Sequence, residues 1–415
     1  MTFKSFNISL CCFVALIIFS GCGRDNGGQL VGSQERPKWK GITNPYGMVY
    51  VPSGNLVVGQ SDQDIFSSYM TRPKAISVTG FFMDETEISN NEYRQFVEWV
   101  RDFKGHEIMG DYYEDDYGNE EIDWELDLDY ESEDLDEMFY TKDNSLSGKR
   151  ELNNSLLDYT YDWINWKKAA SGNYAGRRSE VIEQKTVNIA PDPFVWIRDF
   201  SYSYNEPMTR HYYNHVAFDD YPVVGITWPQ AQAFCHWRTK IWNDGVQETN
   251  ALAENFRLPT EFEWEYAARG GRDQAPFPWG GYYVRNSKGC LLANFKPGRG
   301  NYREDGGEHT VPIDSYFPND FGLYNMAGNV SEWTETTYTA NAYQHIHDLN
   351  PDLKYNAKED DPEAYKLKVV RGGSWKDVHY FLRTDARDYE YQDSAKSFIG
   401  FRCAMTYLGR SIDDF

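Results

Sequence analysis

The chain has 415 residues, a formal net charge of −23 at pH 7 and 40% hydrophobic residues. This length suits one large domain or two ordinary ones. The acidic balance argues against binding to nucleic acid or to anionic lipid surfaces, because both need clustered Lys and Arg. Aromatic residues make up 16% of the chain, which favours an irregular fold whose loops pack on aromatic side chains.

The N-terminus has the pattern of a targeting segment. A lysine and an apolar run too short to span a bilayer comfortably precede two small residues and Cys22. This order resembles a bacterial lipoprotein signal, although Phe19 stands where Leu is usual. We therefore expect residues 1–21 to be removed and Cys22 to be lipidated. An ordinary cleaved signal and an uncleaved anchor are the alternatives.

Residues 22–45 are polar and rich in Gly and Pro, which predicts a tether between the lipid and a domain over residues 46–408. Outside the signal and Cys22, the cysteines are Cys235, Cys290 and Cys403. Three dispersed cysteines are no disulfide framework. Free buried thiols are the default expectation, and one bridge among the three stays open.

The first elements of the domain follow from local patterns. Apolar alternation predicts strands over residues 48–54 and 76–83. Ser89 and Glu92 have the spacing of a capping box, so a helix is expected from there to about residue 100. Its apolar face would carry Tyr93, Phe96, Val97 and Val100.

Residues from 103 to about 215 are predicted to form an insertion. Residues 111–140 hold 15 Asp or Glu and no Lys or Arg. Tyr and Trp are interleaved through the insertion, and disordered segments usually lack aromatics. Part of the insertion should therefore fold against the body, with the acidic stretch mobile or facing a partner. The alternative is a solvated charge run that keeps the protein soluble.

Two further helices are expected after Tyr221. One begins at Pro229, where the missing N–H costs nothing, and the other begins at Pro259-Thr260 and ends at Gly270-Gly271. Short strands and Gly, Asn and Pro turns fill the rest of the chain. These elements predict an α+β domain of low regularity, with few helices, short strands and long loops.

Seven segments resemble, in the same order, motifs of the formylglycine-generating-enzyme (sulfatase-modifying factor) family. The resemblance covers residues 46–407 apart from the insertion, and it implies that family's irregular, C-type-lectin-like fold. The motifs indicate the fold and do not by themselves indicate an activity. They are Phe82–Tyr93, Pro222–Trp228, Arg257–Gly271, Pro278–Gly280, Gly322–Trp333, Val370–Trp375 and Ile399–Cys403.

The resemblance also implies where catalysis would occur. Active members of the family hold copper with two cysteines shortly after the Arg-Gly-Gly-Ser-Trp motif, because soft thiolates select that metal. Here residues 375–383 contain no cysteine, and Asp377 stands at the first ligand position. Cys403 belongs to another motif and is expected to be a packed core thiol. We therefore predict no catalytic residues, no copper and no formylglycine generation.

Other chemistries have weaker signals. Iron-dependent sulfoxide synthases share the fold but add a helical domain with a histidine cluster. His211 and His215, and His345 and His347, have spacings compatible with metal, but each pair lacks a third ligand. A metal-dependent oxidase or other enzyme of the same fold, and a periplasmic glycan-binding module, stay as alternatives.

Structural calcium is more credible, because the family's calcium sites match two places in the chain. Oxygen ligands drawn from turns suit Ca²⁺. The resemblance implies a first site at Asn325, Gly328, Val330 and Glu332. It implies a second, weaker site at Asn294, Phe295, Asp305 and Gly307.

Within the family, three segments behind a lipoprotein signal resemble the GldK (PorK) group of gliding-motility lipoproteins: residues 45–49, 59–64 and 83–100. The GldJ group is a close rival. The resemblance implies an outer-membrane lipoprotein on the periplasmic face. It also implies ring assembly in the type IX secretion system, with a GldN/PorN-type partner and other copies of the chain itself.

Overall fold

The structure is a computed structural model of the chain. It describes residues 44–59, 73–114, 118, 120–141, 143–144, 150–172, 177–202, 206–245, 254–298, 302–304 and 307–409. The predicted signal, Cys22 and nearly all of the predicted tether lie outside these residues. Among the described helices, none is long and apolar enough to cross a membrane.

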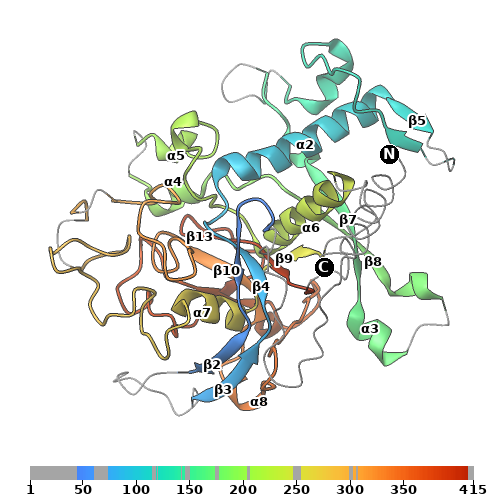
Figure 1. The fold of residues 1–415 in the computed structure, drawn as a ribbon. Helices are drawn as coiled ribbons and strands as arrows, with labels where there is room; N and C mark the ends of the chain where they lie inside the picture. Colours follow the sequence, from blue (N-terminus) through green and yellow to red (C-terminus); the bar gives the residue numbers. More distant parts are fainter. Residues whose placement is uncertain are drawn as a thin grey trace, which may run out of the picture. The chain divides into compact units, whose positions relative to one another are not determined.

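Two four-stranded sheets form the centre of the fold (Figure 1). The first has the order β1 (Met48–Val51), β4 (Phe81–Asp84), β14 (Ala404–Thr406) and β9 (Phe256–Arg257), and it is antiparallel throughout. The second has the order β12 (Asp388–Tyr391), β11 (Leu367–Arg371), β10 (Ser331–Thr337) and β13 (Ile399–Gly400). In this sheet only the β10–β13 pair is parallel, among the strands described. The mixture of short strands and few helices confirms the predicted α+β class.

The single strand predicted over residues 76–83 is wrong, because the chain breaks there into two strands. β3 (Lys74–Val78) pairs with β2 (Gly54–Val58) in a separate hairpin, whereas β4 belongs to the first sheet. Gly80 lies at the break, where an added Cβ would come within 2.7 Å of the Tyr50 hydroxyl. The chain therefore changes sheets at a glycine that faces the Tyr50 hydroxyl.

Helix α2 spans Asn90–Met109 and confirms the predicted start. The Ser89 side chain accepts from the Glu92 amide, and the Glu92 carboxylate accepts from the Ser89 amide, so both halves of the capping box are formed. The four predicted apolar residues are buried. The helix ends at Gly110, whose φ of 77° suits glycine. It therefore includes the first residues that the sequence had assigned to the insertion.

The other two long helices also begin where their local signals predict, and the second ends where predicted. α6 spans Trp228–Gly245, and α7 spans Glu261–Arg269. Thr260 and Glu263 form a second capping box, and Gly270 ends α7 with a φ of 58°. Trp264 in α7 is fully buried and packs with the side chains of β1, β2, β3 and β4. A short helix, α8 (Ala342–His345), completes the body.

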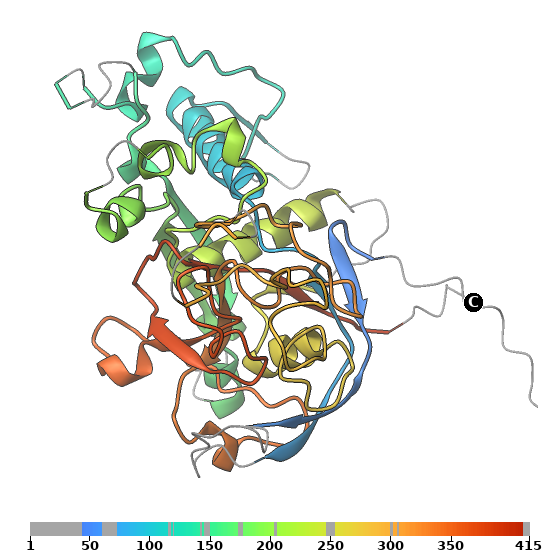
Figure 2. The same ribbon diagram turned by 90° about the vertical axis from the view of Figure 1, so that its left-hand side faces the viewer.

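The insertion is largely folded, as its aromatic content predicted. It contains a hairpin of β7 (Asp158–Ile164) and β8 (Ile182–Asn188), with α3 (Trp166–Ser171) between the two strands. Tyr159 packs on Phe96 of α2 with ring centroids 5.2 Å apart, and Tyr161 stacks on His236 of α6 at 4.2 Å. Figures 1 and 2 both show the green insertion segments against the side formed by α2 and α6.

The acidic stretch is structured over most of its described length. A small hairpin joins β5 (Tyr112–Glu114) and β6 (Glu120–Ile122), and a 3₁₀ turn spans Glu133–Met138. Leu135 and Met138 of this turn are buried, and the turn packs against α2. The stretch is therefore anchored by apolar side chains and presents its carboxylates outward. Two short helices, α4 (Val195–Asp199) and α5 (Met208–His211), follow later in the insertion.

The burial of the three cysteines gives a direct test of this fold. Cys235 and Cys403 are buried with their sulfur atoms 3.5 Å apart, whereas Cys290 is exposed. In the reduced, folded domain over residues 46–408, which lacks Cys22, we expect a maleimide–polyethylene glycol reagent to add once, at Cys290. The added mass on a denaturing gel measures this.

The Cys290→Ser variant should take no label when folded, and it serves as the control. Label on Cys235 or Cys403 in the folded, reduced protein would contradict the burial of that pair.

Candidate functional site

The turn after the Arg-Gly-Gly-Ser-Trp motif places Asp377. Gly372 and Gly373 have φ of 93° and 66°, and a Cβ on Gly373 would lie 2.8 Å from the Phe381 carbonyl carbon. This close passage folds the chain so that Asp377 Oδ2 accepts from the Ser374 amide at 2.9 Å and the Ser374 hydroxyl at 2.6 Å. Burial raises the pKa of Asp377, and these hydrogen bonds oppose that rise. The Asp377 carboxylate thus closes a turn.

The residues of this segment do not fit a copper centre built on thiolates. Residues 375–383 offer Asp377 and His379 but no sulfur. Cuprous copper prefers thiolate and thioether ligands over carboxylate oxygen. Cys403 lies against Cys235 of α6, which supports its prediction as a packed core thiol. No step of a copper-dependent reaction can therefore be assigned to these side chains.

Aromatic side chains of the insertion cover Trp375. Trp196 of α4 stacks on Trp375 with centroids 5.7 Å apart and planes 19° apart, and Phe200 lies at 5.9 Å and 23°. Next to this stack, Lys376 Nζ lies 2.6 Å from Asp199 Oδ1. Trp375 itself is buried. The insertion therefore packs directly on the segment that carries catalysis in active relatives.

A polar cavity of about 430 Å³ lies between α4 and the loop over residues 393–397. Asp192 and Arg198, which line it, pair with each other at 2.6 Å. Both polar atoms of the Gln230 side chain in its wall have hydrogen-bond partners. The oxygen accepts from the Thr227 amide, and the nitrogen donates to the Asn188 and Ala190 carbonyl oxygens. The side chains of this cavity hold the insertion to the body.

A buried carboxylate cluster surrounds the first predicted calcium site. Glu87 is fully buried and accepts from Asn325 Nδ2 at 2.9 Å and Asn329 Nδ2 at 3.0 Å. Burial and then the neighbouring Glu332 carboxylate raise the pKa of Glu87 to about 8. Arg402 and the two asparagine amides act in the opposite direction. The surroundings of Glu87 therefore favour a proton or a cation that compensates its negative charge.

Glu332 is held by donors on both oxygens. Arg402 binds it with Nε at 2.8 Å and Nη2 at 2.6 Å, and Trp264 Nε1 donates to it at 2.7 Å. Two buried carboxylates thus share one guanidinium. The carboxylate and amide oxygens and the excess negative charge fit a hard cation such as Ca²⁺. Asn325 and Glu332 would hold it by their side chains, and Gly328 and Val330 by backbone oxygens.

The second predicted calcium site is described in part. Asn294 and Phe295 are buried, and Asn294 Oδ1 lies 2.8 Å from the position of a Cβ on Gly307. Asp305 lies outside the described residues. The Asn329 amide donates to the Asn294 carbonyl oxygen at 2.9 Å, so the two predicted sites adjoin through neighbouring residues.

The histidine pairs stay separate from these carboxylates. The rings of His211 and His215 lie 6.3 Å apart, and His345 Nε2 contacts the Asn341 amide at 3.2 Å. Within the described part of the chain, no group of three His, Cys, Asp or Glu side chains is placed to hold a metal.

Sequence reasoning missed the residues that organise this centre. Glu87, Asn329 and Arg402 lie in recognised motifs, but only their fold-forming role was considered. Glu87 carried no distinguishing signal, because Asp84, Glu85, Ser89 and Asn90 make the stretch around it polar. Trp196 had none either, because its contact with Trp375 joins segments 179 positions apart.

The two sheets, the capped helices and the turn at Asp377 define the class of protein, an α+β domain of the formylglycine-generating-enzyme type. A family model, the sulfatase-modifying factor enzyme 1-like domain, matches residues 34–407. The chain belongs to this family.

Its relatives include an active and an inactive enzyme. It is 28% identical to the formylglycine-generating enzyme of Mus musculus over 87% of this chain and 75% of that protein. It is 34% identical to the inactive C-alpha-formylglycine-generating enzyme 2 of Bos taurus, over 45% of this chain and 50% of that protein. Among solved structures, PvdO from Pseudomonas aeruginosa has a TM-score of 0.48 at 17% identity, covering 87% of this chain and 94% of PvdO. Family membership is compatible with either a catalytic or a non-catalytic chain.

The Arg402–Glu332 pair should be one of the larger single contributions to stability. Arg402→Met leaves Glu332 buried with its main cation removed, which we expect to lower the free energy of unfolding by about 3–5 kcal/mol. Arg272→Met is the matched control, because its exposed pair with Asp320 should contribute about 1 kcal/mol or less. Denaturant titration followed by tryptophan fluorescence measures both. Equal losses in the two variants would contradict the role of Arg402.

Proposed function

We propose that the chain is a non-catalytic scaffold lipoprotein of the type IX secretion and gliding machinery, of the GldK (PorK) kind. It would lie on the periplasmic face of the outer membrane and form rings with a GldN/PorN-type partner and with copies of itself. The observation that carries the non-catalytic part is the Asp377–Ser374 turn, which stands where active relatives hold copper with thiolates. The part that concerns secretion rests on the sequence resemblance.

The way in which the insertion is attached supports a scaffold role. Ring contacts bind it to the body at two separate places, Trp196 at one and the neighbouring Tyr159 and Tyr161 at the other. A segment held at two places presents a surface of fixed geometry, and ring assembly needs contacts that repeat with the same rotation. The same contacts cover Trp375 and take up the space beside the segment where relatives react.

The acidic hairpin supplies a surface for a partner. All three residues of β5 and both glutamates of β6 are exposed, so carboxylates and tyrosine rings share one small sheet. An electronegative surface accelerates encounter with a basic partner, and exposed tyrosines add contact area. A basic face on the GldN/PorN-type partner would complement it. The lipid anchor would raise the local concentration of neighbours in the plane of the membrane.

The catalytic alternative can be tested with purified mature protein. Copper is added in the cuprous form and the excess is removed. The copper that stays bound is then measured, and the protein is assayed separately for turnover of a cysteine peptide. We expect less than stoichiometric copper and no aldehyde product, because no thiolate pair lies after Trp375. Stoichiometric copper together with conversion of the cysteine peptide to an aldehyde would overturn the scaffold proposal.

The acidic hairpin can be tested by neutralising it without changing its shape. The triple variant Glu114→Gln, Glu120→Gln, Glu121→Gln should slow association with the ring partner about tenfold at low salt, with less effect at high salt. Surface plasmon resonance at two salt concentrations measures the rate.

The control for this experiment removes the same charge elsewhere, with Glu359→Gln, Asp360→Asn and Glu363→Gln, all at exposed positions. If both triple variants slow association equally, net charge rather than the hairpin is responsible.

We also propose that calcium occupies the Asn325–Glu332 centre. Two buried carboxylates beside one guanidinium support this, and the binding energy would add to folding stability. At a calcium concentration 100 times the dissociation constant, the gain would be about 2.7 kcal/mol. Thermal unfolding in calcium, in magnesium and in EGTA measures it. We expect a higher midpoint in calcium alone, and identical midpoints in all three would refute the proposal.

A further inference from the structure

A buried network of charged side chains surrounds α7. Glu261 and Glu265 are fully buried, and three arginines contact them. Arg387 binds Glu261 through Nε at 2.8 Å and Nη2 at 3.0 Å. Glu265 Oε1 lies 2.6 Å from Arg269 Nη2, and Glu265 Oε2 lies 2.7 Å from Arg371 Nη2. Two carboxylates therefore face three guanidiniums.

The excess positive charge of this network cannot be removed by the loss of a proton. A guanidinium does not lose its proton in a protein, so none of the three arginines can become neutral. A buried charge without a counter-charge is strongly destabilising. Within the described part of the chain, no other carboxylate lies within ion-pair distance of these three arginines. Among the described residues, this network therefore has one more positive charge than its carboxylates neutralise.

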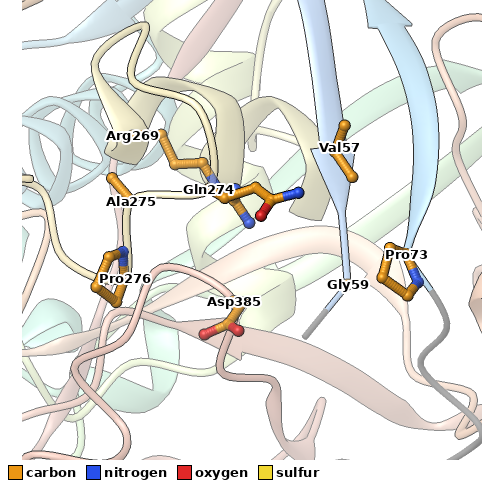
Figure 3. Close-up of a pocket in the computed structure, with 8 residues that line it drawn as sticks. All are labelled: Val57, Gly59, Pro73, Arg269, Gln274, Ala275, Pro276 and Asp385. Atoms are coloured by element: carbon orange, nitrogen blue, oxygen red, sulfur yellow. The ribbon is translucent and has the colours of Figure 1, made fainter. Parts of the chain in front are cut away.

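Arg269 is the member of the network that faces free space. It is 3% exposed, yet its Nε and Nη1 have no hydrogen-bond partner among the described residues. It lines a small cavity, with free space of about 10 Å³, between the end of α7, the end of β2 and the loop before β12. Figure 3 shows the Arg269 and Gln274 side chains pointing into the middle of the group of lining residues.

The remaining wall of the cavity decides what can enter. Val57 and the two prolines, Pro73 and Pro276, close it with apolar surface. Asp385 also lines the cavity, but both of its oxygens pair with Arg383, at 2.9 and 2.7 Å, and this guanidinium compensates its negative charge. The space accommodates about one water-sized occupant, so a monatomic ion fits it better than phosphate or a carboxylate group does.

We propose that this cavity is a binding site for a monovalent halide, and chloride is the ion that its size and charge would select. One free guanidinium N–H of Arg269 supplies a charge-assisted hydrogen bond, and the Gln274 amide supplies a second donor. The bound ion neutralises the network and joins the end of α7 to β2 and to the loop before β12. This site is independent of the proposed scaffold function and of the calcium centre.

The decisive experiment uses the full mature chain crystallised with sodium bromide in place of chloride. Bromide scatters anomalously, so we expect an anomalous difference peak in the cavity, at hydrogen-bond distance from Arg269. A cavity that holds a water molecule without anomalous signal, or that is filled by another part of the chain, would overturn the proposal. This test does not depend on any variant folding.

Thermal unfolding at constant ionic strength gives a second test. Replacing gluconate by chloride should raise the midpoint of the wild-type protein by about 3 °C, and bromide should act similarly. Arg269→Gln removes the excess charge and the charge-assisted donor, and Gln274→Met removes the neutral donor. We expect the halide-dependent rise to vanish in the first variant and to shrink in the second.

Arg272→Gln is the matched control, because Arg272 lies three residues further along, is exposed and pairs with Asp320. It should keep the full halide-dependent rise. If Arg269→Gln does not fold, the bromide experiment and the Gln274→Met variant still decide the question. Equal midpoints of the wild-type protein in gluconate and chloride would contradict the proposed site.

Discussion

The buried guanidinium of Arg402 is the interaction on which the arrangement of the two sheets depends. It binds the Glu332 carboxylate at the start of β10 and donates to the Asp84, Glu85 and Tyr324 carbonyl oxygens. These acceptors belong to the first sheet, to the loop after β4 and to the approach to the second sheet. One side chain therefore satisfies backbone groups that neither sheet could pair by itself. Without it, the buried Glu332 carboxylate would keep only the Trp264 indole as a donor and would lose its counter-charge, which is among the costlier defects a core can have.

This arrangement leaves loops to form the surface where chemistry takes place in active relatives. The turn at Gly372-Gly373 needs glycine for its backbone path and brings Ser374 back to Asp377. The same backbone conformation could place either a metal ligand or a hydrogen-bond acceptor at position 377. The backbone path of this turn thus does not require a metal ligand at position 377. Trp375 presents an apolar surface next to this turn, and Trp196 and Phe200 of the insertion pack on it.

Most local features of the fold could be predicted from the sequence because their causes lie within a few residues. The capping boxes at Ser89 and Thr260, and the glycine that ends α7, depend only on neighbours three or four positions away. The break at Gly80 could not be predicted, because it depends on where Tyr50 lies across the sheet. For the same reason the partners of Glu87, which are 238 and 242 positions away, were not evident. Motifs identified the family, and Cys403 was expected in the core, where it lies, but the contacts between motifs could not be deduced from the sequence.

The two buried charge clusters show opposite imbalances, and this difference constrains how the domain is stabilised. Around Glu87 and Glu332 there is one guanidinium for two carboxylates, whereas around Glu261 and Glu265 there are three guanidiniums for two carboxylates. Carboxylates can relieve an excess by taking up a proton, and the raised pKa of Glu87 shows that tendency. Arginines have no such route, so an excess of arginine needs an external anion, whereas an excess of carboxylate can be met by a cation or a proton. The positive cluster is therefore the more demanding of the two, and Arg269 is the member of it that opens on a cavity.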